Sequence, residues 1–100
     1  MSTAVWDLRT DQVSWQPEVH RLLGRDPGLG PLSLDQLLRA DRPALRRVVT
    51  SALLRGQAES GLVPIERPGG EPCRLQVTGE PMLDQDGQVT ALRMSLRQLA

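Results

Sequence analysis

Two stretches near the end of the chain, "PCRLQVTGEPML" (72–83) and "VTALRMSLRQL" (89–99), decide the fold class, because apolar and polar residues alternate in both. Strand residues point alternately to opposite faces of a sheet, so this period of two predicts β-strands with one face toward a core. The residues predicted to face the core are Cys73, Leu75, Val77, Leu92, Met94 and Leu96. Between the stretches, "QDGQ" (85–88) contains an Asp-Gly pair typical of a tight turn. We predict an antiparallel hairpin.

Two further segments extend this sheet, one just before these strands and one at the N-terminus. In "GLVPIERPGGEP" (61–72), Val63 and Ile65 share one face and "PGG" supplies a turn, which predicts a three-stranded meander over residues 60–99. At the N-terminus, "TAVWDL" (3–8) and "VSWQ" (13–16) flank a turn at Thr10 and Asp11, which predicts a hairpin over residues 3–16.

Residues 17–55 have helical patterns instead. "PEVHRLLG" (17–24) predicts a short helix that Gly24 ends, a Gly- and Pro-rich loop follows, and Ser33 with Gln36 forms a capping-box pattern before a second helix. The stretch "DRPALRRVVTSALLRG" (41–56) predicts the longest helix, with Asp41 as cap and Gly56 as its end. Its apolar stripe consists of Leu45, Val48, Val49, Ala52 and Leu53. We predict a solvated opposite face carrying Arg42, Arg46 and Arg47.

Length and charge limit the function. One hundred residues suffice for one domain, and twelve basic groups balance twelve acidic ones, so we expect neither nucleic acid nor an anionic membrane surface as partner. A single cysteine excludes an internal disulfide, and no apolar run is long enough to cross a bilayer, which favours the cytoplasm. All basic residues are Arg, which suggests a GC-rich bacterial genome.

The order of these motifs resembles the PAS domain of bacterial signalling proteins, over residues 1–100 as a single domain. The opening matches at Trp6, Asp7, Leu8, Trp15, Leu22, Leu23 and Gly24, and later positions match at Asp41, Arg42, Gly70 and Gly87. The resemblance implies an α+β fold with a five-stranded antiparallel sheet of order 2-1-5-4-3 and short helices packed on one face. It further implies a sensory, regulatory and protein-interaction module that acts by dimerisation or partner contact, with its output domain elsewhere.

The cysteine raises a separate hypothesis. "CRLQ" at Cys73 resembles the motif with which light-oxygen-voltage (LOV) photoreceptors hold a photoreactive thiol. In that family, however, the thiol lies on a central helix, whereas Cys73 falls in a predicted strand and points inward. We expect a small buried hydrophobe with an inert thiol.

Other cofactors and catalysis have little support in the sequence. The one histidine, His20, is expected to be an ordinary partly exposed residue, and one His with one Cys does not assemble a zinc site. No nucleophile–base pattern is present, so we predict no enzyme activity, no metal site and no obligate cofactor. A sensor loaded with haem, flavin or a metabolite remains the alternative.

Two regions are candidates for function. The first is a core cavity for a small apolar ligand, lined by Val19, Leu23, Leu37, Leu45, Val49, Val63, Ile65, Leu75, Val77 and Met94. The second is the outer face of the sheet, where alternation places Leu62, Arg74, Gln76, Ala91, Arg93, Ser95 and Arg97. We expect this face to contact a second copy or a neighbouring signalling domain.

Overall fold

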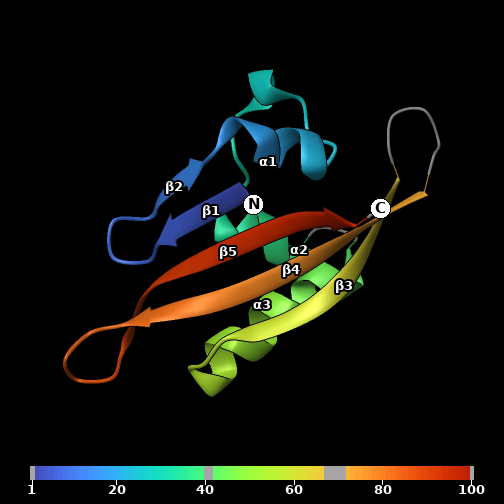
Figure 1. Ribbon diagram of the computed structural model, residues 1–100. Coiled ribbons are helices and arrows are strands. Elements are labelled where there is room, and N and C mark those ends of the chain that lie inside the picture. Colours follow the sequence, from blue (N-terminus) through green and yellow to red (C-terminus); the bar gives the residue numbers. More distant parts are fainter. Residues whose placement is uncertain (1, 40–41, 67–71, 100) are drawn as a thin grey trace.

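The computed structural model describes residues 2–39, 42–66 and 72–99 of the chain. The elements, in order, are β1 (Ser2–Asp7), β2 (Gln12–Trp15), α1 (Pro17–Leu22), the 3₁₀ helix η1 (Pro27–Leu29), α2 (Leu34–Arg39), α3 (Pro43–Arg55), β3 (Glu59–Glu66), β4 (Pro72–Leu83) and β5 (Val89–Leu99). The strands form one antiparallel sheet of order β2-β1-β5-β4-β3 (Figure 1). The predicted topology is confirmed.

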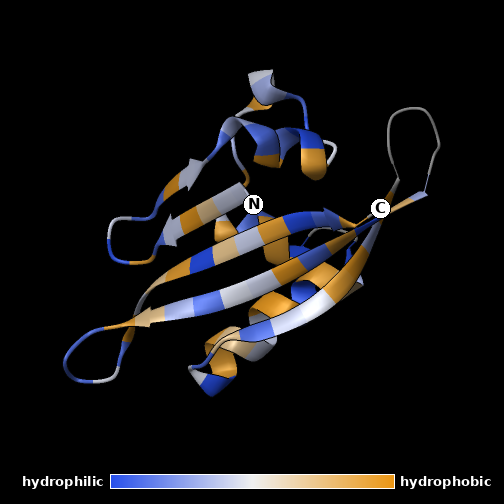
Figure 2. Cartoon of the chain, in the orientation of Figure 1, coloured by the Kyte–Doolittle hydropathy of each residue, from blue (hydrophilic) through white to orange (hydrophobic). Residues whose placement is uncertain are grey.

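Register follows the alternation of the two long strands. Leu96 on β5 lies opposite Val77 on β4 and Ser2 on β1, and Met94 lies opposite Gly79 and Ala4. These positions share one face, so buried side chains of neighbouring strands meet across the ladder. Figure 2 shows the alternation as bands of hydrophobic and hydrophilic residues along β4 and β5. The core therefore lies on one side of the sheet.

Helices α2 and α3 cover that side (Figure 1). Helix α3 begins at Pro43, where a missing N–H costs nothing, and ends at Gly56, whose φ of 64° is a conformation that side-chain-bearing residues rarely adopt. Val48 of α3 packs so closely on β3 that a Cβ at Gly61 would lie 2.8 Å from its Cγ2 atom. The expected cap Asp41 and the turn glycine Gly70 lie outside the described residues.

The short helix α2 depends on its cap. The Gln36 N–H donates to the Ser33 hydroxyl over 3.1 Å, and the Ser33 N–H donates back to the Gln36 side chain over 3.0 Å. This reciprocal pair satisfies donors that the first helical turn leaves free, and it confirms the predicted capping box.

Over the described residues, no helix has the length and apolarity needed to cross a membrane.

Candidate functional site

A pocket of about 470 Å³ opens between α1, η1, α2 and the start of α3. We call it the Arg42 pocket, and its lining consists of Leu23, Gly24, Arg25, Asp26, Leu29, Leu32, Leu37, Arg42 and Leu45. Its size is within the usual range for small-molecule sites, about 300–1,000 Å³. Five leucines make most of its wall apolar, while the charged groups come from the loop after α1 and from the residue before α3.

The predicted cavity residues divide between this pocket and the packed core. Leu23, Leu37 and Leu45 line the pocket and are almost completely buried. The remaining seven, which do not line it, are Val19, Val49, Val63, Ile65, Leu75, Val77 and Met94. All seven belong to the hydrophobic core, Ile65 as a partly buried member at its edge. The pocket thus lies at the helical margin of the core, next to the loop.

The loop wall of the pocket is held by its own polar groups. Asp26 accepts from the Gly28 N–H over 2.9 Å and so caps η1. The Arg25 side chain reaches back across the loop, and its Nε donates to the Gly30 carbonyl over 2.6 Å. Its Nη2 also lies 3.4 Å from the Leu29 carbonyl. Arg25 is therefore largely occupied by the loop that carries it.

Strand β1 anchors the other end of this loop. The indole Nε1 of Trp6 donates to the Leu32 carbonyl over 2.9 Å, while the ring itself is buried in the core. A buried indole N–H needs a partner, and the loop carbonyl supplies it. The tryptophan that begins the sequence match thus fixes one wall of the Arg42 pocket.

Arg42 differs from its prediction. Arg46 and Arg47 are exposed, as expected for a solvated helix face, but Arg42 is only partly exposed and borders the pocket. Its Nη2 donates to the Leu23 carbonyl over 2.5 Å, which ties the end of α1 to the start of α3. The expectation failed because Arg42 occupies the N-cap of α3, where the helical period no longer determines where a side chain points.

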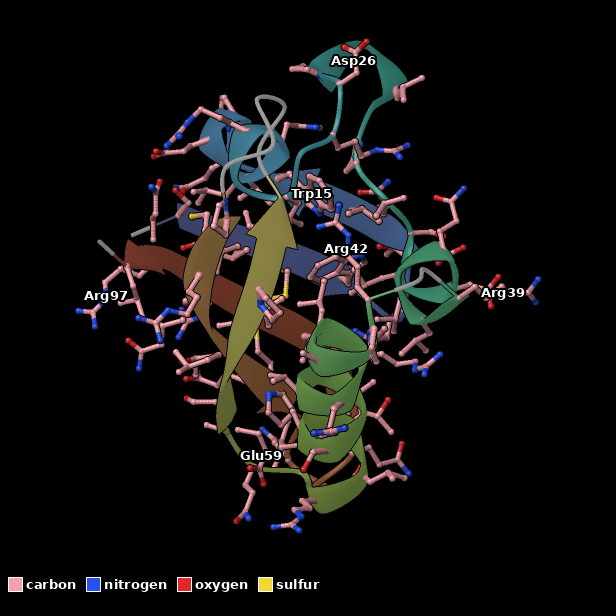
Figure 3. All side chains as sticks on the ribbon, turned by 90° about the vertical axis from the view of Figure 1, so that its right-hand side faces the viewer. Trp15, Asp26, Arg39, Arg42, Glu59 and Arg97 are labelled. Atoms are coloured by element: carbon pink, nitrogen blue, oxygen red, sulfur yellow. The ribbon has the colours of Figure 1, made fainter. Side chains whose placement is uncertain are left out.

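The Arg42 guanidinium also forms no ion pair with any residue that the structure describes. Its Nη1 is buried with no hydrogen-bond partner, and it takes part in none of the ion pairs found among the described residues. Burial lowers the pKa of the group below its ordinary value, although a guanidinium stays protonated at neutral pH. Figure 3 shows Arg42 near the start of α3, with the loop of Asp26 beyond it. A partly desolvated cation thus borders a space lined mainly by leucines.

His20 is also placed differently from the prediction. It is buried rather than partly exposed, and its ring centroid lies 4.9 Å from that of Trp15. The cause is tertiary: Trp15, at the end of the edge strand β2, lies against the imidazole, and Trp6 in turn meets Trp15 edge-on. Helical spacing on a helix of six residues carries no information about such a neighbour.

Cys73 lies on β4 with its side chain buried beside the core, as the alternation predicts. It borders a small depression with Ile65 and Leu99, and it does not line the Arg42 pocket. Among the described residues, no three His, Cys, Asp or Glu side chains gather in a way that could hold a metal ion.

The outer sheet face carries the predicted interface residues on β3, β4 and β5. Its polar groups pair across strands: Arg93 lies 2.9 Å from Glu80, and Arg97 donates to Gln76 over 2.6 Å. Leu62 at the edge of this face is 53% exposed. The seven predicted residues, Leu62, Arg74, Gln76, Ala91, Arg93, Ser95 and Arg97, are all exposed or partly exposed. The face is mixed in character, and several of its polar groups pair with one another.

Solved structures share this fold over nearly the whole chain. A LOV protein of Rhodobacter sphaeroides superposes with a TM-score of 0.68 at 21% identity, covering 99% of this chain and 59% of that protein. A PAS domain from Colwellia psychrerythraea gives 0.67 at 16% identity, covering 98% and 85%. A sensory box histidine kinase/response regulator from Burkholderia thailandensis gives 0.62 at 12% identity, covering 98% and 76%.

These likenesses establish the fold alone, because all three identities are low. The chain spans less than two thirds of the Rhodobacter LOV protein. No protein-family model matches the sequence, and no curated protein matches it either.

Proposed function

We propose that this PAS-fold domain is the sensory and regulatory module of a bacterial signalling protein, spanning residues 1–100 as one unit in the cytoplasm. It has no catalytic activity of its own and controls an output domain through self-association or contact with a neighbouring domain. The observation that carries the proposal is the likeness to PAS and LOV structures over 98–99% of the chain, including a sensory box histidine kinase. The Arg42 pocket supports a role for a small ligand.

The contact surface in this proposal is the outer face of the sheet. That face lies opposite the helices, and Leu62 gives it an exposed apolar group beside polar side chains. Interfaces commonly join an apolar centre to a polar rim, and a two-fold contact uses the same patch on both copies. A bound ligand would act by favouring one of two arrangements of this contact.

A flavin photoreceptor of the LOV kind is not supported by the residues. The resemblance requires a thiol facing the cofactor, whereas Cys73 does not line the Arg42 pocket. The nine lining residues also include no aromatic side chain to stack on a flat ring and no His, Cys, Met or Tyr to bind haem iron. We therefore favour an aliphatic ligand over these cofactors.

The proposal is tested by joining residues 1–100 to the kinase region of a histidine kinase whose own PAS domain has been removed. We expect regulated autophosphorylation that Leu62→Arg abolishes, since a charge would be buried in the contact without a partner. Leu54→Arg is the matched control, because Leu54 is 82% exposed on the outer side of α3. Sedimentation velocity of the isolated domain gives the oligomeric state of each variant.

Equal kinase activity and equal oligomeric state for the unmodified chimera, Leu62→Arg and Leu54→Arg would contradict the proposal. The same holds if Leu54→Arg alone disrupts the assembly, because the contact would then lie on α3.

A further inference from the structure

Arg42 is a charged group whose surroundings leave part of its hydrogen-bonding capacity unused. Its Nη2 has the Leu23 carbonyl as partner, but Nη1 is buried with no partner among the described residues. A buried donor without a partner is unfavourable, and a desolvated cation without a counter-ion more so. Such groups are rare in native structures and call for an explanation.

The space next to Arg42 has the opposite character. Leu23, Leu29, Leu32, Leu37 and Leu45 form its apolar wall, and the pocket holds about 470 Å³. A ligand that matches both features must combine a hydrocarbon body with one anionic end. We infer that the Arg42 pocket binds an aliphatic carboxylate, with its tail against the leucines and its carboxylate on the Arg42 guanidinium. This inference rests on the proposed sensory function and names its ligand class.

The charges around the pocket favour a carboxylate over a phosphate. Over the part of the chain that the structure describes, Arg42 is the one pocket arginine with a buried donor that has no partner, while Arg25 donates to the Gly30 and Leu29 carbonyls. Asp26 adds a negative charge to the same lining, which opposes a dianion more than a monoanion. A carboxylate also accepts two parallel N–H bonds from one guanidinium.

Binding would also affect the contact between two helices. Nη1 is closed to solvent in the structure, so a carboxylate must draw the guanidinium toward the pocket. That movement competes with the Arg42–Leu23 hydrogen bond between the end of α1 and the start of α3. The ligand is then coupled to the packing of α1 and α3 through a single side chain. It therefore has different affinities for the arrangements of the two helices with and without the Arg42–Leu23 hydrogen bond.

Isothermal titration of the domain with octanoate and 1-octanol tests the inference, because the two probes share chain length and differ in charge. We expect octanoate to bind about tenfold or more tightly than 1-octanol, as a charge-assisted hydrogen bond allows. Arg42→Gln should remove this preference and leave 1-octanol binding unchanged. Arg46→Gln is the control, since Arg46 is exposed on the same helix and does not line the pocket.

Three outcomes would overturn the inference: equal affinity for both probes, a preference that survives Arg42→Gln, or no binding of either. Arg42→Lys, which keeps the charge, should retain part of the preference, and far-UV circular dichroism confirms that each variant is folded. The kinase chimera separates this result from the broader proposal. Regulation that persists without octanoate binding would refute the ligand class alone, whereas octanoate binding without regulation would refute the sensory function.

Discussion

Cys73 and Arg42 show how far a single residue's role follows from its neighbours in the chain. Cys73 resembles a photoreceptor motif, yet the alternation of β4 places it inward beside Leu75, and the structure buries it there. Arg42 was expected to share the solvated face of Arg46 and Arg47, yet it is only partly exposed and borders a pocket. A strand period determines which way a residue faces, whereas an N-cap has no such period.

Because Cys73 is buried, we expect its thiol to react slowly. We expect a thiol reagent to modify it at least about a hundredfold more slowly in the native protein than in urea, because access requires local opening of β4. The double variant Cys73→Ala, Thr50→Cys is the control, since Thr50 is exposed on α3 and should react quickly. Rapid labelling of native Cys73 would show that the strand opens readily or that the side chain faces solvent.

At the scale of helices and strands, helix caps could be predicted from the sequence, whereas the close contact between α3 and β3 could not. The capping box of Ser33 and Gln36 and the terminal Gly56 involve residues near in sequence, and both appear as predicted. The approach of α3 to β3 does not follow from sequence, because Gly61 and Val48 belong to elements with separate local patterns. In the strand pattern, Gly61 differs from its neighbours only in having no side chain, and this does not reveal that a helix approaches closely.

Gly61→Ala is expected to destabilise the protein by about 1–3 kcal/mol, the usual cost of overpacking. The added Cβ would lie 2.8 Å from Val48 Cγ2, so α3 or β3 must shift. Gly79→Ala is the matched control, because its Cβ would meet Ala52 at an ordinary 3.4 Å, and it should cost less. Urea unfolding measures both.

A second substitution identifies the contact responsible. Val48→Ala removes the clashing methyl group and should recover part of the loss when combined with Gly61→Ala, giving a non-additive double-mutant cycle. Additive effects of the two substitutions would mean that this contact does not limit the packing of α3.

For the whole molecule, the balance of charge is the dominant property. The chain has twelve arginines and twelve acidic residues. Several of them form ion pairs, as Arg93 does with Glu80 and Arg39 does with Asp35. Exposed pairs of this kind add little stability, but they cancel the field that would attract a polyanion. Arg46 and Arg47 on α3 therefore belong to a domain with no net charge.

Nucleic acids should not bind this domain. We expect no change in fluorescence anisotropy of labelled single-stranded RNA or duplex DNA at about 50 mM salt, where phosphate contacts are strongest. Salt-dependent binding would refute the expectation, and its loss in Arg46→Gln, Arg47→Gln would assign it to α3.

The sequence by itself determined the strands, their inward faces, the capping box of α2 and the glycine that ends α3, since each depends on a local period or on groups a few residues apart. Sheet order came from the resemblance, and the structure confirms it. Tertiary structure alone decided that Trp15 covers His20, that Arg25 closes its own loop, and that Arg42 joins α1 to α3 beside a leucine-lined pocket. The first and third arrangements depend on where separate elements meet, and Arg25 lies in a loop, where no local period determines the direction of a side chain.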